Sequence, residues 1–196
     1  MTVKLDFELL VIAKWLLLKQ DSAGRARVVL LRGSGYSQQC PLIVLRPNDT
    51  RLEVGVTTHY HTLVTLTCKA ALPLHTWTHI AVVSEGSRVR LFIDGTLEAQ
   101  RSTGSPCMGG AHPIFVGKLP DGAVTFEGLR GGFEGSVASL RYHTRALSPI
   151  HVRIVYDQGP PVQRSREAIH HQYLQYTCLL HQAAGAPATA RLFGTK

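Results

Sequence analysis

The chain has 196 residues, of which 44% are hydrophobic and 17% charged, and 21 basic against 13 acidic side chains give a net charge of +8. This length and hydrophobic content predict one domain of ordinary size with a substantial core, which excludes intrinsic disorder. A membrane-spanning helix is excluded as well: the most apolar run, Leu9 to Leu18, contains Lys14 and is about half the roughly 20 residues that a span needs. The acidic residues before this run also disfavour a signal peptide.

The positive charge would suit an acidic partner such as nucleic acid, but its distribution argues against one. Arginines are scattered along the chain, and no aromatic–glycine pattern typical of an RNA-binding sheet lies between them. We therefore expect a solvated basic surface and no nucleic-acid partner.

The cysteines bear on metal binding and on compartment. Cys40, Cys68, Cys107 and Cys178 are far apart and form no C-x-x-C pair, so a metal cluster or a redox dithiol finds no support in their spacing. Two disulfides would be compatible with the even count. Sparse cysteines in a domain with an ample core nevertheless favour free thiols and an intracellular compartment, cytoplasmic or organellar, over secretion. The sequon at Asn48 points the other way, although a turn between two strands also accounts for it.

Short apolar, β-branched runs separated by turn residues extend from the N-terminus to residue 143. Alternation of polar and apolar side chains in 51–56 and 88–93 is typical of strands with one buried face, and Asp94-Gly95 predicts a tight hairpin turn. Many strands joined by short turns predict an antiparallel β-sandwich or barrel. The predicted strands are Lys4–Leu17, Arg27–Arg32, Leu42–Leu45, Arg51–Thr57, His61–Cys68, Trp77–Ser84, Arg88–Ile93, Thr96–Arg101, Ile114–Gly117 and Phe133–His143.

The last third of the chain changes character. Ser148 as N-cap and Pro149 at the first helical position predict a short helix, and a Gly-Pro-Pro sequence then predicts a linker. We predict two parts, a sandwich over residues 1–158 and a tail over 159–196. The tail contains an amphipathic helix from about Arg166 to Gln182, whose apolar stripe consists of Ile169, Tyr173, Tyr176 and Leu180.

Five segments, taken in order, carry a family resemblance. They are Leu72–Val83 with its Trp-x-His, Val89–Gly95 with Phe-x-Asp-Gly, Phe115–Gly117, Phe133–Arg141, and Arg145–Ser148 followed by Tyr156. Together they resemble the laminin-G-like branch of the concanavalin A-like jelly rolls over roughly residues 3–158. The resemblance implies an all-β, antiparallel jelly-roll sandwich, here with a C-terminal amphipathic helix. Some members hold calcium, but no Asp-rich loop of the kind such a site needs is present, so we expect no calcium and no other cofactor.

The same fold also carries glucanases, so catalysis needs a direct test. A retaining glycosidase needs two carboxylates about 5–5.5 Å apart. The catalytic strand of the family's glucanases resembles Glu-x-Asp-x-x-Glu, and this chain contains no such string. Asp6 and Glu8 are the only acids two positions apart, and we interpret them as a solvated strand face. His59 and His61 could share a strand face as metal ligands, but no third ligand has matching spacing, which favours a solvated loop. We assign no catalytic, cofactor-binding or metal-binding residue.

These observations predict a non-catalytic module that docks a protein partner within a larger protein or assembly. The alternative is an extracellular-type, lectin-like domain that binds a glycan or a receptor. The candidate partner-binding residues are the stripe Ile169, Tyr173, Tyr176 and Leu180, which either packs on the chain's own sandwich or docks on a partner.

Overall fold

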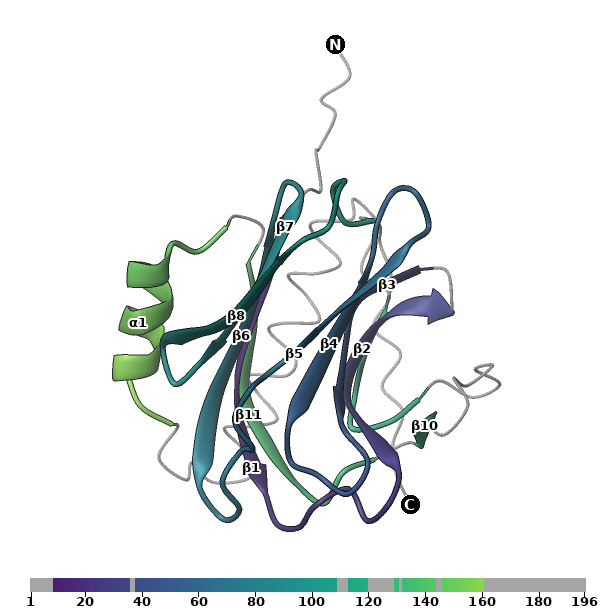
Figure 1. The fold of residues 1–196 in the computed structure, drawn as a ribbon. Coiled ribbons are helices and arrows are strands. Elements are labelled where there is room, and N and C mark those ends of the chain that lie inside the picture. Colours follow the sequence, from purple (N-terminus) through teal and green to yellow (C-terminus); the bar gives the residue numbers. More distant parts are fainter. Residues whose placement is uncertain are drawn as a thin grey trace, which may run out of the picture. The chain divides into compact units, whose positions relative to one another are not determined.

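The computed structural model describes residues 9–35, 38–108, 113–119, 129–130, 132–143 and 146–160. They form two β-sheets packed face to face, with one helix against the outside of one sheet (Figure 1). This arrangement confirms the predicted antiparallel sandwich. The chain divides into two compact units, Met1–Pro160 and Pro161–Lys196, and all described residues belong to the first.

The first sheet has five strands in the order β11-β1-β6-β7-β8, and every neighbouring pair is antiparallel. Its strands are β1 (Leu9–Leu18), β6 (Trp77–Glu85), β7 (Arg88–Ile93), β8 (Thr96–Ser102) and β11 (Gly135–His143). A bulge interrupts the pairing of β1 with β11 between Ala13 and Trp15, so β11 passes Lys14 with an irregular register. Gly135 pairs with Leu18 at the other end, and any Cβ there would lie 2.1 Å from the Leu17 carbonyl oxygen, so only glycine fits.

The second sheet has six strands built on the order β10-β2-β3-β4-β5, with β9 also paired to β2. Its strands are β2 (Ala26–Gly35), β3 (Gln38–Leu45), β4 (Leu52–Thr57), β5 (Leu63–Thr67), β9 (Ile114–Val116) and β10 (Leu129–Arg130). The two-residue β10 runs parallel to β2, and the other pairs are antiparallel. The sequence did not predict β10, because two residues carry no periodicity.

Local sequence signals correspond well to the observed elements. The strand predicted over 88–93 has those bounds in the structure, and Asp94 and Gly95 have φ of 48° and 74°, as a two-residue turn of the hairpin type requires. The start of the first predicted strand, before residue 9, lies outside the described residues.

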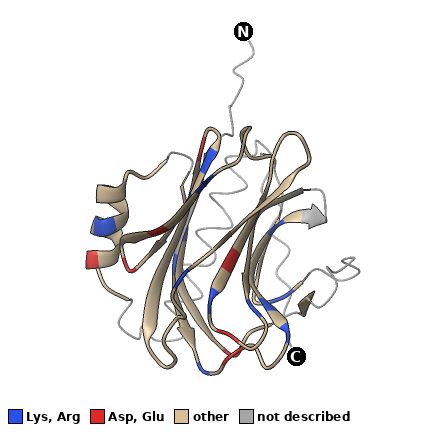
Figure 2. Ribbon diagram, viewed as in Figure 1, with Lys and Arg blue, Asp and Glu red and all other residues tan. Residues whose placement is uncertain are grey.

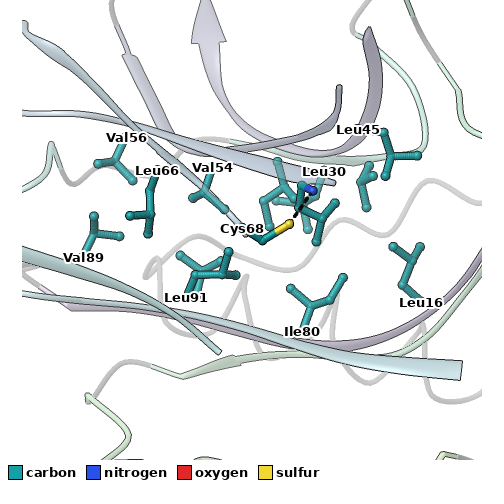
Figure 3. Close-up of a cluster of buried hydrophobic side chains, with 14 of the residues drawn as sticks. Leu16, Leu30, Leu45, Val54, Val56, Leu66, Cys68, Ile80, Val89 and Leu91 are labelled. Carbon is teal, nitrogen blue, oxygen red and sulfur yellow. Dashed lines mark hydrogen bonds between the residues drawn. The ribbon is translucent and has the colours of Figure 1, made fainter. Parts of the chain in front are cut away.

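The core lies between the two sheets and is formed by the inward face of each strand (Figure 3). Strand alternation places Leu16 of β1 and Ile80 of β6 opposite Leu45 and Val54 of the second sheet, all of them buried. Burying one such side chain stabilises the fold by about 1.5–3 kcal/mol, so this layer supplies most of the apolar stabilisation.

The only helix among the described residues is α1 (Pro149–Asp157), as predicted from its capping residues. The Ser148 hydroxyl accepts a hydrogen bond from the backbone N–H of His151, and Pro149 occupies the first turn. Val152 is buried against Ala81, Val83 and Phe92 on the outer face of the first sheet. The opposite side of α1 exposes Ile150 and Ile154.

The helix predicted over 166–182, with Ile169, Tyr173, Tyr176 and Leu180, lies outside the described residues. Within the described part, no helix is both long and apolar enough to cross a membrane. Figure 2 shows the described Lys and Arg positions spread over α1, both sheets and the loops, consistent with the scattered arginines of the sequence.

Candidate functional site: a rim turn above a thiol pair

The outer face of the second sheet is covered by apolar side chains over β2 and β3. Val28 of β2 and Leu42 and Val44 of β3 point outward yet are buried, because Phe115, Leu119 and Leu129 pack with them. A ligand would have to displace this apolar layer to reach the sheet. On the other half of this sheet, Glu53 of β4 is half-buried and Leu63 at the start of β5 is exposed.

The one acidic side chain on β4 or β5 is Glu53. Its register partners are Val44 on one side and Thr67 on the other, neither of which carries a carboxyl. Other described acids have structural partners: Asp94 accepts from the His79 backbone N–H, and Glu98 accepts from two backbone N–H groups in the loop after β5. Across the paired strands of the described chain, no second carboxylate thus lies beside Glu53. Asp6 and Glu8 are outside the described residues.

A tight turn joins β4 to β5, and we call its residues Thr58–Thr62 the rim turn. The Thr58 backbone N–H donates to the Thr62 carbonyl at 3.0 Å, and the His61 N–H donates to the Thr58 carbonyl at 2.8 Å. A second segment supports the turn from outside, since the His59 N–H donates to the Pro106 carbonyl at 3.0 Å. The turn is thus fixed both internally and from the chain after β8.

The rim turn displays an aromatic ring between two imidazoles. Tyr60 is 79% exposed, and its neighbours His59 and His61 are exposed as well. Such a group offers a flat apolar ring face, a phenolic hydroxyl and imidazole nitrogens for hydrogen bonding. Among the described residues no group of three or more His, Cys, Asp or Glu side chains could hold a metal ion.

Two cysteines meet in the core beneath the rim turn. Cys40 of β3 and Cys107, which follows β8, are both buried and hydrogen-bond to each other through their thiols. The Ser84 hydroxyl also donates to the Cys107 sulfur at 3.0 Å. These hydrogen bonds lower the pKa of Cys107 to about 7 against the opposing effect of burial, whereas the same thiol contact and burial raise the pKa of Cys40.

The family-like Trp-x-His segment serves packing. The His79 ring lies 5.2 Å from the Trp15 ring and 6.1 Å from the Tyr156 ring of α1, measured between centroids. Burial, with a smaller contribution from Arg141, lowers the pKa of His79 to about 4, so the ring is neutral at physiological pH. Among the described residues neither of its ring nitrogens has a hydrogen-bond partner, which is consistent with a structural role.

The structure thus brings together residues that the sequence analysis did not assign to a site. Tyr60 has no sequence signal of its own, because a single aromatic residue in a turn does not reveal whether its ring is exposed. The pairing of Cys40 with Cys107 has no sequence signal, because the two are far apart along the chain. The residues that were assigned, from Ile169 to Leu180, are outside the described part.

Comparison with known proteins gives a consistent result. A family model described as the concanavalin A-like lectin/glucanases superfamily matches residues 12–153. A heptameric SAP-like pentraxin from Limulus polyphemus is similar with a TM-score of 0.57 and 15% identity, covering 76% of this chain and 70% of the pentraxin. A search of curated proteins found no match.

Two further solved structures share the fold. One is a putative carbohydrate binding protein from Bacteroides ovatus, with a TM-score of 0.58 and 13% identity over 78% of this chain and 42% of that one. The other is the ligand binding domain of botulinum neurotoxin serotype D in complex with N-acetylneuraminic acid, with a TM-score of 0.56 and 12% identity over 76% and 36%. This chain therefore spans less than half the length of either, and identities this low concern the fold alone.

Proposed function

Because the chain belongs to the concanavalin A-like lectin/glucanase superfamily, we propose that its sandwich is a non-catalytic, lectin-like binding module that holds a glycan at the rim turn. The observation that carries this proposal is the exposure of Tyr60 on a turn fixed from two sides. A sugar ring has an apolar C–H face and hydroxyl groups at its edge. The Tyr60 ring suits the face, and the imidazoles of His59 and His61 suit the hydroxyls.

The proposal that the module is non-catalytic rests on the arrangement of the described acids. Glycoside hydrolysis needs two carboxylates that flank the scissile bond, and the cross-strand neighbours of Glu53 are Val44 and Thr67. A sugar held at the rim turn would thus meet an aromatic ring and imidazoles, and the described strands place no second carboxylate beside Glu53. Two structures that share the fold, a putative carbohydrate binding protein and a neurotoxin domain in complex with N-acetylneuraminic acid, support the choice of a glycan.

The test compares the full chain with two single variants on a glycan array, followed by titration of the best glycan. Tyr60→Ala should weaken binding by about tenfold or more, the effect of losing roughly 1.4 kcal/mol of stacking. Leu97→Ala is the matched control, because Leu97 is also an exposed apolar residue but lies on β8 of the other sheet. Failure of the wild type to retain any glycan, or equal affinity of Tyr60→Ala, would contradict the proposal.

A protein partner, which the sequence favoured, is the second candidate and has its own observation. Ile150 and Ile154 are 72% and 50% exposed and lie one turn apart on the outer side of α1. An apolar helix face of this kind suits a groove on another protein. The double variant Ile150→Ser/Ile154→Ser should then lose association with a protein that binds the wild type and keep glycan binding unchanged.

A further inference from the structure

Thr57, at the end of β4, joins the two chain segments that carry Cys40 and Cys107. The Gln39 backbone N–H donates to the Thr57 hydroxyl at 3.2 Å, and the Met108 N–H donates to the Thr57 carbonyl at 2.7 Å. The residue before one cysteine and the residue after the other are thus bonded to the same threonine. Cys107 itself pairs with Thr58 in an isolated antiparallel bridge. The backbone therefore brings both cysteines to the end of β4 independently of any contact between their side chains.

The two thiols have different chemical roles. Hydrogen bonds from Cys40 and Ser84 lower the pKa of Cys107, which favours its thiolate, and the thiolate is the nucleophilic form. Cys40 stays protonated, because its pKa is raised. One sulfur is therefore the nucleophile toward an oxidant, and the second thiol lies on the segment that Thr57 holds beside it, where it can resolve the product.

We propose that Cys40 and Cys107 form a disulfide when the protein meets a peroxide, and that this cross-link ties the base of the rim turn to β3. The Cys107 thiolate attacks one peroxide oxygen, the O–O bond breaks, and hydroxide leaves, which gives a sulfenic acid on Cys107. Cys40 sulfur then attacks Cys107 sulfur, the S–S bond forms, and the S–O bond breaks. The Cys40 proton leaves with the hydroxyl as water. The two thiols lose two electrons in total, and the peroxide is reduced.

Cys68 provides an internal control for this chemistry. It is also buried, but its sulfur accepts from the Leu52 N–H at 2.9 Å and donates to the Ala70 carbonyl at 3.1 Å. Burial raises its pKa, which disfavours the thiolate. Cys68 should therefore stay reduced under conditions that oxidise the pair.

The experiment counts thiols in the full chain after denaturation and maps its peptides, before and after hydrogen peroxide. The reduced protein should show all four cysteines as thiols, and the oxidised protein should show two, with one linked peptide containing Cys40 and Cys107. Dithiothreitol should restore the original count. Cys68→Ala should still form the linked peptide. Cys40→Ser should leave a sulfenic acid on Cys107 that dimedone captures.

Two outcomes would overturn the proposal. One is an unchanged thiol count after peroxide has been consumed, and the other is a linked peptide that contains Cys68 or Cys178 in place of the pair. The peptide map of the wild-type protein distinguishes the proposed Cys40–Cys107 link from both of these outcomes, without relying on the folding of any variant. It is also independent of whether the rim turn binds a glycan.

Discussion

Among the described residues, Lys14 is the largest side chain with less than 2% of its surface exposed, and its amine is unusual in an apolar core. It lies on β1 on the same face as Leu16 and Leu18, is 1% exposed, and its amine has no hydrogen-bond partner among the described residues. Burial lowers the pKa of this amine from 10.5 to about 7. Because one pKa unit corresponds to about 1.4 kcal/mol, the amine destabilises the fold by about 4 kcal/mol at pH 7. Replacing it with methionine, which has similar length and no charge, should restore roughly that amount.

The lowered pKa of Lys14 also predicts how the free energy of unfolding changes with pH. Between pH 7 and 10.5 the unfolded chain keeps the Lys14 proton that the folded chain has lost, so stability rises with pH across this window. Below pH 7 both forms are protonated and the full penalty applies. Cys107, with its pKa lowered to about 7, adds a slope of the same sign up to its ordinary value near 9. The difference between wild type and variant at each pH removes that contribution, because both proteins contain Cys107.

Urea unfolding at pH 6, 7, 8 and 9 would measure this difference. Lys14→Met should be more stable than wild type at pH 6, and its advantage should shrink by about 1.4 kcal/mol for each pH unit above 7. Lys19→Met, which changes an exposed lysine just beyond β1, is the matched control and should follow the wild type. A difference between Lys14→Met and wild type that stays constant over this range would refute the reasoning.

Two further predictions concern metal, catalysis and the tail. The sequence has no Asp-rich loop for calcium, so millimolar Ca²⁺ should leave the unfolding temperature unchanged; calcium bound only to the folded state would raise that temperature by several degrees. The same preparation should not hydrolyse β-glucans, and released sugar would contradict this expectation. Ending the chain at Pro161 should lower the free energy of unfolding by about 2 kcal/mol or more if the stripe of Ile169, Tyr173, Tyr176 and Leu180 packs on its own sandwich. Unchanged melting together with loss of a partner in pull-down would instead assign the stripe to that partner.

The parts of the fold that the sequence predicted are those with local causes. Alternation over 88–93 requires only that one strand face be buried, and the Asp94-Gly95 turn requires only residues that tolerate positive φ. The cap at Ser148 likewise acts within one helical turn. The parts that were missed depend on distant pairing. β10 exists because two residues pair with β2, and the thiol contact exists because β3 and the segment after β8 meet at Thr57.

The same distinction applies to the proposed binding site. Several residues that carry the family resemblance have scaffold roles in or against the first sheet: His79 packs on Trp15 and Tyr156, Asp94 holds the His79 backbone, and Gly135 fits where no Cβ could. None of the three is displayed to solvent as Tyr60 is. The rim turn, by contrast, joins β4 to β5 of the second sheet and contains none of the five segments that carry the resemblance. Family membership accounts for the sandwich, whereas the proposed glycan site rests on the exposed side chains of this turn. A variant that changes Tyr60 alone would separate the proposed glycan binding from folding, because this residue is 79% exposed and contributes little to the core.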